Sequence, residues 1–209
     1  MAVRGQTRQK LVECAIQLLR TEGLSAVTTV RVTRGAGIAQ SGFYKHFKSI
    51  DGLLEAAAER ISTYSVKVIS TRRGRVSAGL ASDGVVRISE IRTAYEDMLA
   101  FFVGDPVLTE LLLRCRFERS VIGERVRDLL ETTRNELLDD LWDWARRHRG
   151  ASPEVYPRVA LAAELIQGQM LAVVEALVFE RFKDSGAAAD TLARATVSVL
   201  ESVVRQTPS

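Results

Sequence analysis

Cysteine and histidine are scarce in this chain, and their scarcity excludes several classes of protein. The 209 residues include two cysteines and two histidines. Cys14 and Cys115 lie far apart and belong to no CxxC or Cys/His group, so the sequence predicts neither a disulfide framework nor a metal site. His46 and His148 leave few places for Ser/His/Asp or Cys/His catalysis. We expect two small buried thiols, no metal and no cofactor.

Other sequence patterns of enzymes are missing as well. The run Gly35-Ala36-Gly37 begins like a dinucleotide-binding fingerprint, but the third glycine would fall at Gln40 and no strand precedes the run. The acids of the pair 139–140 are adjacent on an expected helix, so their side chains point about 100° apart. Such pairs are typical of a solvated helix face. The chain is therefore expected not to be an enzyme.

Long uncharged apolar runs and an N-terminal secretion signal are also missing. Residues 1–10 are polar and basic and contain no apolar segment of signal-peptide type. No uncharged apolar run approaches the ~20 residues that a membrane-spanning helix needs. We expect a cytoplasmic protein without a membrane partner.

Strand-like alternation of apolar and polar residues is absent, and the apolar residues recur at helical spacing instead. With 46% apolar and 26% charged residues, the chain suits either one large domain or a small head and a larger body, each with a core. An all-α fold is expected. We predict helices over about 7–22, 50–71, 91–102, 121–149, 156–182 and 188–205, another opened by Asp105-Pro106, a flexible loop at 74–84, and a short arm carrying Arg4.

Residues 28–48 are the stretch around which the chain is organised. Two apolar sets at helical spacing flank Gly37, a residue free to adopt a positive φ. This pattern predicts a helix, a tight turn and another helix. The second helix begins with small residues and continues with hydrogen-bond donors, which suits entry into a DNA major groove. The first apolar set is Val27, Val32 and Ala36, and the second is Ile38, Phe43 and Phe47.

Positive charge is concentrated in the same part of the chain. Residues 1–50 contain eight Lys and Arg but only Glu13 and Glu22 as acids, a net charge of +6, whereas the whole chain carries +3. The remaining residues therefore carry −3. A basic head favours phosphate neutralisation and predicts salt-dependent binding to nucleic acid.

The order and spacing of these residues resemble the DNA-binding head of the TetR family of bacterial one-component regulators. The resemblance rests on Thr28-Thr29, on the run VTRGAGI at 32–38 and above all on the motif FYKHF at 43–47. It covers roughly the first fifty-five residues and supplies only an architecture beyond them. That architecture is a three-helix helix-turn-helix DNA-binding domain over residues 1–50, joined by a long helix to a helical effector-binding and dimerisation domain over residues 51–209.

The resemblance implies a DNA-binding transcriptional regulator, in the form of a ligand-responsive repressor that binds a palindromic operator as a homodimer. A helical small-molecule-binding or protein-interaction module without DNA function is the alternative. The contacts that the resemblance implies with double-stranded DNA are made by Thr28, Thr29, Gln40, Ser41, Gly42, Tyr44, Lys45, His46 and Lys48.

Three residues depart from the family pattern. Ala39 stands where a small polar residue usually caps the recognition helix, and losing such a cap costs about 1 kcal/mol. Gly35 lies inside the first helix of the motif, where glycine costs roughly 1 kcal/mol relative to alanine. Ile50 replaces the family's phosphate-contacting lysine at the start of the fourth helix, and Lys48 is the candidate to take over that contact.

The last two predicted helices are apolar around more of their circumference than a surface helix requires. One apolar face can pack within the subunit, and the other needs a partner. The resemblance implies that this helix pair forms the four-helix bundle of a homodimer. The two stripes predicted on the last helix are Leu192, Ala195, Val199 and Val203, and Ala193, Val197, Leu200 and Val204.

The resemblance also implies a pocket for a small-molecule effector between the fourth helix and the helices that follow it. An apolar pocket with few polar groups favours a hydrophobic or aromatic effector. Ordinary core packing is the alternative role for each candidate lining residue. The candidates are Tyr64, Met98, Phe102, Phe117, Gln167 and Met170.

Overall fold

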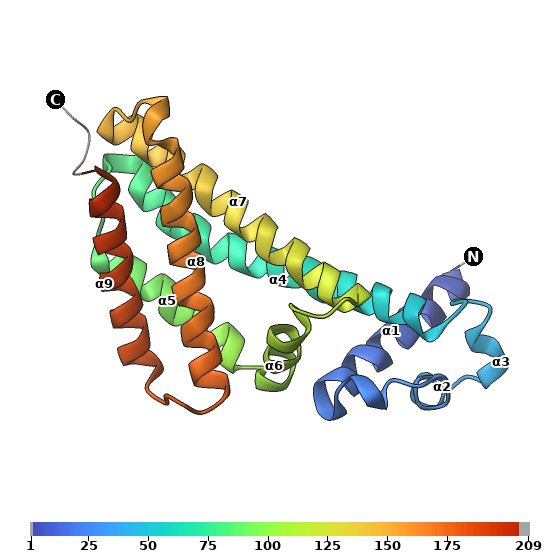
Figure 1. Cartoon of the computed structure of the whole chain (residues 1–209). Coiled ribbons are helices and arrows are strands. Elements are labelled where there is room, and N and C mark those ends of the chain that lie inside the picture. Colours follow the sequence, from blue (N-terminus) through green and yellow to red (C-terminus); the bar gives the residue numbers. More distant parts are fainter. Residues whose placement is uncertain (1, 205–209) are drawn as a thin grey trace. The chain divides into compact units, whose positions relative to one another are not determined.

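The chain folds into helices joined by turns and loops, and residues 2–204 of the computed structural model contain no strand (Figure 1). The structure describes residues 2–204, except the side chains at positions 2–4, 66, 72, 73, 75–83, 111, 149 and 204. The all-α fold class is confirmed. One compact unit comprises the residues up to Ser65 together with Asp105–Leu129, and the other comprises Val66–Gly104 together with the residues from Leu130 onward. These units do not coincide with the expected division at residue 50.

The first unit is built around a helix-turn-helix. Side chains from four of its helices meet in one hydrophobic core. Its helices are α1 (Ala2–Glu22), α2 (Thr29–Ala36), α3 (Gln40–Phe43), the first part of α4 (Ile50–Asp83), α6 (Pro106–Cys115) and the first part of α7 (Val121–Arg149). The core side chains with at most 1% of their surface exposed are Leu11, Ala15, Leu19, Val32, Phe43, Leu53 and Ala57.

Two glycines allow α2 to pack and to end where it does. Gly37 adopts a φ of 68° at the end of α2, and its N–H donates to the carbonyl oxygen of Arg34 at 3.2 Å. A side chain in this left-handed region would be strained, so glycine suits the turn. At Gly35 a Cβ would lie 3.1 Å from the Sγ of Cys14 on α1. The glycine that weakens α2 by propensity therefore lets α2 approach α1 closely.

The second unit consists of the remainder of α4 and α7 together with α5 (Ile88–Val103), α8 (Tyr156–Val178) and α9 (Ser185–Val204). Helix α9 packs against both α5 and α8, and α8 and α9 run side by side in Figure 1. The core of this unit joins α7, α8 and α9. Its buried side chains include Leu141, Trp144, Val159, Ala163, Ile166, Leu200 and Val203.

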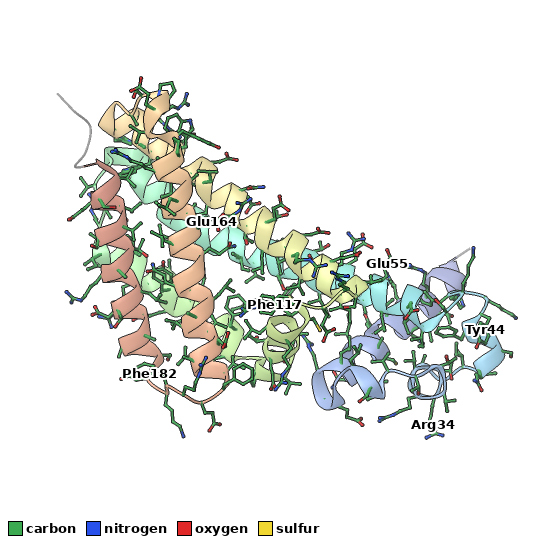
Figure 2. All side chains as sticks on the ribbon, viewed as in Figure 1. Arg34, Tyr44, Glu55, Phe117, Glu164 and Phe182 are labelled. Atoms are coloured by element: carbon green, nitrogen blue, oxygen red, sulfur yellow. The ribbon has the colours of Figure 1, made fainter. Side chains whose placement is uncertain are left out.

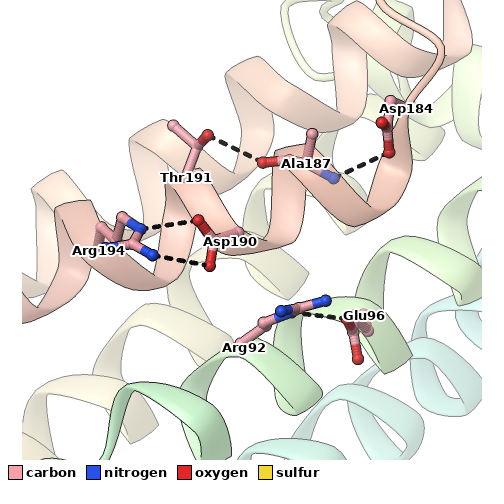
Figure 3. A network of polar contacts seen from close by, with 7 residues as sticks. All are labelled: Arg92, Glu96, Asp184, Ala187, Asp190, Thr191 and Arg194. Carbon is pink, nitrogen blue, oxygen red and sulfur yellow. Dashed lines mark hydrogen bonds and ion pairs between the residues drawn. The ribbon is translucent and has the colours of Figure 1, made fainter.

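Local polar contacts determine where α9 begins and stiffen its first turns (Figure 3). The backbone N–H of Ala187 donates to Oδ1 of Asp184 at 2.9 Å, so Asp184 caps the helix. One turn further, Arg194 donates to Asp190 at 2.7 Å, and this hydrogen bond lowers the pKa of the Asp190 carboxyl. The predicted break at Asp184 is therefore confirmed, although α9 begins at Ser185, three residues before the expected start.

The two separate stripes predicted on α9 are not observed. The buried face draws residues from both predicted stripes, because α9 packs against α5 and α8 at once. Ala195, Val197 and Val199 are only partly buried, and the side chain of Val204 lies outside the described residues. The buried residues between positions 192 and 203 of α9 are Leu192, Ala193, Thr196, Leu200 and Val203.

Helix α4 is longer than the sequence predicted. The prediction of a flexible loop at 74–84 is wrong, because α4 continues to Asp83. The residue that follows it, Gly84, has a φ of 70°. Glycine and serine lower helix propensity, but unlike proline they neither remove a backbone N–H nor clash with the preceding turn. The end of α4 is held by α7, since Nε1 of Trp144 donates to the Gly84 carbonyl at 3.2 Å.

Other predicted helix ends are mostly confirmed. Ser49 caps α4 by accepting from the N–H of Gly52 at 3.2 Å, and Asp105 caps α6 by accepting from Leu108 at 3.2 Å. Helix α7 has the predicted bounds, but α8 ends at Val178, four residues before Phe182. The predicted arm is wrong, because α1 begins at Ala2 and includes the backbone of Arg4.

One described helical stretch, Pro153–Val178, is long and apolar enough to cross a membrane by length and composition alone. This stretch is not an uncharged apolar run of the kind that the sequence lacks, because Glu164 and Glu175 interrupt it. Glu164 accepts from Arg134 of α7 at 2.6 Å, and Val159 and Val174 are buried within the second unit. One side of this helix is therefore packed within the second unit.

The helical state of residue 74 can be tested by substitution. A Cβ at Gly74 would meet no other atom within 4 Å, so Gly74→Ala should stabilise the protein by about 0.5–1 kcal/mol. Gly74→Pro should destabilise it by about 3 kcal/mol, because proline disrupts a helix interior. Both free energies of unfolding can be measured by circular dichroism in denaturant. Two near-neutral substitutions would indicate a loop instead.

Candidate nucleic-acid interface and ligand cavity

Two buried aromatic rings anchor the segment after the helix-turn-helix turn. Phe43 is fully buried and Phe47 is 6% exposed, and their ring centroids lie 5.8 Å apart. Both belong to the core formed with α1 and α4. The guanidinium of Arg8 lies over the ring of Phe47 at 4.9 Å. The intervening residues are thereby held at the surface by apolar packing.

The polar residues predicted to contact DNA lie mainly on the exposed side of this anchored segment. Tyr44 is 61% exposed and stands at the surface in Figure 2. Thr29, Gly42 and His46 are partly buried. The structure brings these residues together within one short stretch of the first unit. The exposed members of the predicted set are Thr28, Gln40, Ser41, Tyr44, Lys45 and Lys48.

The recognition helix is shorter than the sequence predicted. Helix α3 ends at Phe43, so Tyr44, Lys45 and His46 occupy a hydrogen-bonded turn. The N–H of His46 donates to Phe43 at 2.9 Å, an i to i−3 bond that tightens the chain. Ala39 at the N-cap makes no side-chain capping bond, as its methyl group predicts.

The two threonines at the start of α2 have mainly local roles. The hydroxyl oxygen of Thr28 accepts from the N–H of Arg31 at 3.4 Å and caps α2. The carbonyl oxygen of Thr29 accepts from the hydroxyl of Thr33 at 2.7 Å. Thr28 therefore positions the start of α2 and remains exposed beside it.

Several basic residues of the head are already paired with acids. Arg31 donates to both carboxylate oxygens of Glu22, at 2.7 and 2.6 Å, and this bond lowers the pKa of Glu22. Arg20 pairs with Asp105 at 2.8 Å, and Arg60 pairs with Glu13 at 2.9 Å. Of the basic residues in 1–50, Arg20 and Arg31 are therefore already neutralised by acids, whereas Arg60 lies beyond residue 50.

Other cations of the first unit are exposed and take no part in an ion pair with any described residue. Lys10, Arg34, Lys45 and Lys48 are among them. Lys48 directly precedes Ser49, the cap of α4, so it lies at the positive end of a long helix. Ile50 begins that helix and is partly buried.

A cavity of about 150 Å³ lies within the second unit. Helices α4, α5, α7, α8 and α9 each contribute to its lining, and most of the lining side chains are apolar. Four of the predicted effector-contacting residues, Met98, Phe102, Gln167 and Met170, line it. Both amide hydrogens of Gln167 are used within the unit, because Nε2 donates to Leu130 at 2.8 Å and to Thr133 at 3.1 Å.

Two predicted pocket residues need correction. Tyr64 and Phe117 belong to the first unit, and neither lines the cavity. They are 59% and 79% exposed. Aromatic character suggested a buried role for both. Their side chains instead point outward, and the guanidinium of Arg116 covers the Phe117 ring at 4.6 Å.

Sequence reasoning missed a buried polar pair in the cavity wall. The hydroxyl oxygens of Tyr95 on α5 and Thr196 on α9 lie 2.6 Å apart, and Nε2 of Gln169 donates to Thr196 at 2.8 Å. Burial raises the pKa of Tyr95, and hydrogen bonds to Thr196 and Gln169 oppose this shift. A threonine within the apolar face of α9 was the signal that could have revealed the pair.

Comparison with known proteins identifies the family. Residues 11–57 match the model for bacterial regulatory proteins of the tetR family. A solved structure from Mesorhizobium loti, described as a TetR-family transcriptional regulator, has a TM-score of 0.71 and 15% identity, over 96% of this chain and 97% of that one. Residues 11–57 are a TetR-family DNA-binding domain, and the chain has the fold of TetR-family regulators. It is a DNA-binding transcriptional regulator with the helix-turn-helix in its first unit.

Other TetR-like relatives extend over most of the regulator. The nucleoid occlusion factor SlmA of Vibrio campbellii is 28% identical over 179 residues, covering 84% of this chain and 86% of the relative. The FadR regulator of Bacillus subtilis, solved in complex with stearoyl-CoA, has a TM-score of 0.60 and 17% identity, over 94% of this chain and 97% of that one.

The ion-pair pattern predicts which cations of the TetR-family regulator contribute to salt-dependent DNA binding. Lys48→Ala should reduce the slope of log affinity against log salt by about 0.9 per subunit, the value for one lost phosphate contact. Arg31→Gln is the matched control and should change the slope little, because Glu22 already neutralises Arg31. Fluorescence anisotropy with labelled duplex DNA measures both slopes. A larger change for Arg31→Gln would contradict the assignment.

Proposed function

We propose that this protein is a ligand-responsive repressor that binds a palindromic operator as a homodimer and acts in the cytoplasm, without enzymatic activity. The observation that carries the proposal is the surface segment around Tyr44, which exposes donors while Phe43 and Phe47 stay buried. This arrangement suits base and phosphate contacts in a major groove. The proposed DNA-binding domain is residues 1–50, with residues 51–209 serving effector binding and dimerisation.

The DNA contacts divide by chemistry into two groups. Gln40 and Ser41 begin the short recognition helix with exposed side chains, and amides and hydroxyls read base edges. Tyr44, Lys45 and Lys48 present a phenol and two ammonium groups, which suit phosphate oxygens. Gly42 has no side chain, so it allows the backbone to approach the DNA closely. Thr28, Thr29 and His46 complete the proposed surface.

An exposed apolar face of α8 supports the homodimer. Leu161 and Leu165 are 59% and 51% exposed, although both are large aliphatic side chains. Gly168 and Ala172 continue the same helix face with small exposed residues, which allow a partner helix to approach closely. Exposed apolar stripes of this kind mark interaction sites. The twofold symmetry of such a dimer would match an operator with half-sites roughly 34 Å apart or a simple multiple of that distance.

The cavity in the second unit supports the response to a ligand. It is enclosed mainly by apolar side chains, so a hydrophobic or aromatic molecule fits it. The structurally similar FadR of Bacillus subtilis was solved in complex with stearoyl-CoA, which supports a ligand with an apolar part. Met98, Phe102, Gln167 and Met170 are the proposed contacts, and Tyr64 and Phe117 are no longer included.

Operator recognition can be tested by sequencing genomic fragments retained by the purified protein. The wild type should enrich a palindromic sequence near promoters, and Gln40→Ala should alter the enriched bases. Tyr44→Phe should weaken binding to every site by about 1 kcal/mol, because it removes one hydrogen bond to phosphate. Tyr156→Phe, also at an exposed tyrosine, is the matched control and should bind as the wild type does.

Two other outcomes would count against parts of this proposal. Unchanged binding of both Gln40→Ala and Tyr44→Phe would show that the recognition segment is misassigned. Sites spread over the whole chromosome would favour the role named for the Vibrio relatives, nucleoid occlusion, over repression of particular genes.

The dimer can be tested at Leu165. Leu165→Glu should convert the dimer to a monomer, because association would bury an unpaired carboxylate. Val107→Glu, at an exposed valine of α6, is the control and should leave the dimer intact. Leu200 is unsuitable because it is 3% exposed and belongs to the core of its own unit. Sedimentation at micromolar concentration measures both variants, and a monomeric wild type would disprove the dimer.

A further inference from the structure

The cavity wall contains a hydroxyl pair whose hydrogens can be counted. Tyr95 and Thr196 both line the cavity, are 4% and 6% exposed, and have their oxygens 2.6 Å apart. Each hydroxyl supplies one hydrogen, so the pair has two. The bond between the two oxygens uses one of them, whichever residue is the donor.

The second hydroxyl hydrogen has no acceptor among the residues that the structure describes. With the Gln169 amide oriented as it is in the structure, Nε2 donates to Thr196, so Gln169 does not accept the remaining hydrogen. If Thr196 donates to Tyr95, the Tyr95 hydrogen is left over. If Tyr95 donates to Thr196, the Thr196 hydrogen is left over. In either case the pair retains one hydrogen-bond donor beside the cavity.

A buried donor without an acceptor is costly, so a molecule in the cavity must satisfy it. Water can do so in the ligand-free protein. A ligand that displaces the water has to bring an acceptor of its own, or it loses the displaced water's hydrogen bond. The cavity therefore selects for an acceptor atom at one position on an otherwise apolar ligand.

The charges around the cavity determine which acceptor is suitable. No described lining residue is basic, and the one acidic lining residue is Asp140. A carboxylate in this setting would be desolvated without a cation to balance it. A neutral oxygen avoids that penalty and still accepts the hydrogen.

We propose that the cavity binds an uncharged, largely apolar compound whose carbonyl oxygen accepts a hydrogen bond from the Tyr95–Thr196 hydroxyl pair. This inference rests on the proposed ligand-responsive function and specifies its ligand class. A cavity of about 150 Å³ suits a ligand built on one aromatic ring, since an engineered cavity of similar size binds benzene.

Calorimetry on the full-length protein without DNA tests the proposal with matched probes. Acetophenone and α-methylstyrene have the same shape, but only acetophenone has an oxygen in place of the terminal CH₂ group. The wild type should bind acetophenone about 2- to 10-fold more tightly, the effect of one net hydrogen bond. Benzoate should bind more weakly than acetophenone, because its charge would be desolvated.

Variants of the pair make the test specific. The double variant Tyr95→Phe/Thr196→Val should bind both probes equally and should bind α-methylstyrene at least as tightly as the wild type does, because it leaves no buried hydroxyl donor unsatisfied. Retained binding of α-methylstyrene also shows that the cavity has survived. Each single variant keeps one hydroxyl hydrogen, so the preference for acetophenone should persist in both.

Equal affinities in the wild type, tighter binding of benzoate, or no binding of either neutral probe would overturn the proposal. Because DNA is absent, these outcomes are independent of whether ligands control the operator. A separate gel shift with acetophenone tests that control: operator binding that does not change would count against ligand response, while the affinity ratio would still decide the ligand class.

Discussion

Burial of Phe43 and Phe47 is the interaction on which the proposed DNA-binding surface depends. Helix α3 has four residues, far fewer than an isolated helix needs to persist in water, so its own propensity cannot hold it. The two rings bind the segment to the core shared by α1 and α4. Tyr44 and Lys45 are exposed as a consequence, because they lie between two anchored positions.

Close helix contacts impose a second constraint, at positions where a larger residue could not fit. At Gly84 a Cβ would lie 2.5 Å from Cγ of His148, and the φ of 70° already favours glycine. Trp144 donates to the carbonyl of the same residue. The end of α4 and the start of the following segment are thus fixed by α7, which a pattern of local helix breakers could not reveal.

The sequence predicted the parts of the fold that local chemistry determines. Caps such as Ser49 and Asp105, the left-handed Gly37 and the bounds of α7 follow from neighbouring residues and were found as expected. The sequence-based predictions were wrong where tertiary packing determines the local structure. Residues 74–83 are helical despite their glycines and serines, and α9 presents to its core a face drawn from both predicted stripes. Among the candidate pocket residues, aromatic type alone could not distinguish the exposed Phe117 from Phe102 in the cavity wall.

Helix α4 is the element that could couple ligand binding to DNA binding, because it contributes residues to both units. Without a break it supplies Ile61 to the core of the first unit and Ile69 to the cavity wall of the second. If a ligand shifts the regulator between two states, linkage requires operator DNA to weaken ligand binding by the same factor, about 5- to 150-fold for a coupling of 1–3 kcal/mol. A ligand with equal affinity for both states changes nothing, however tightly it binds. Regulation would therefore depend on contacts that differ between the states, and not on the total apolar surface that the cavity buries.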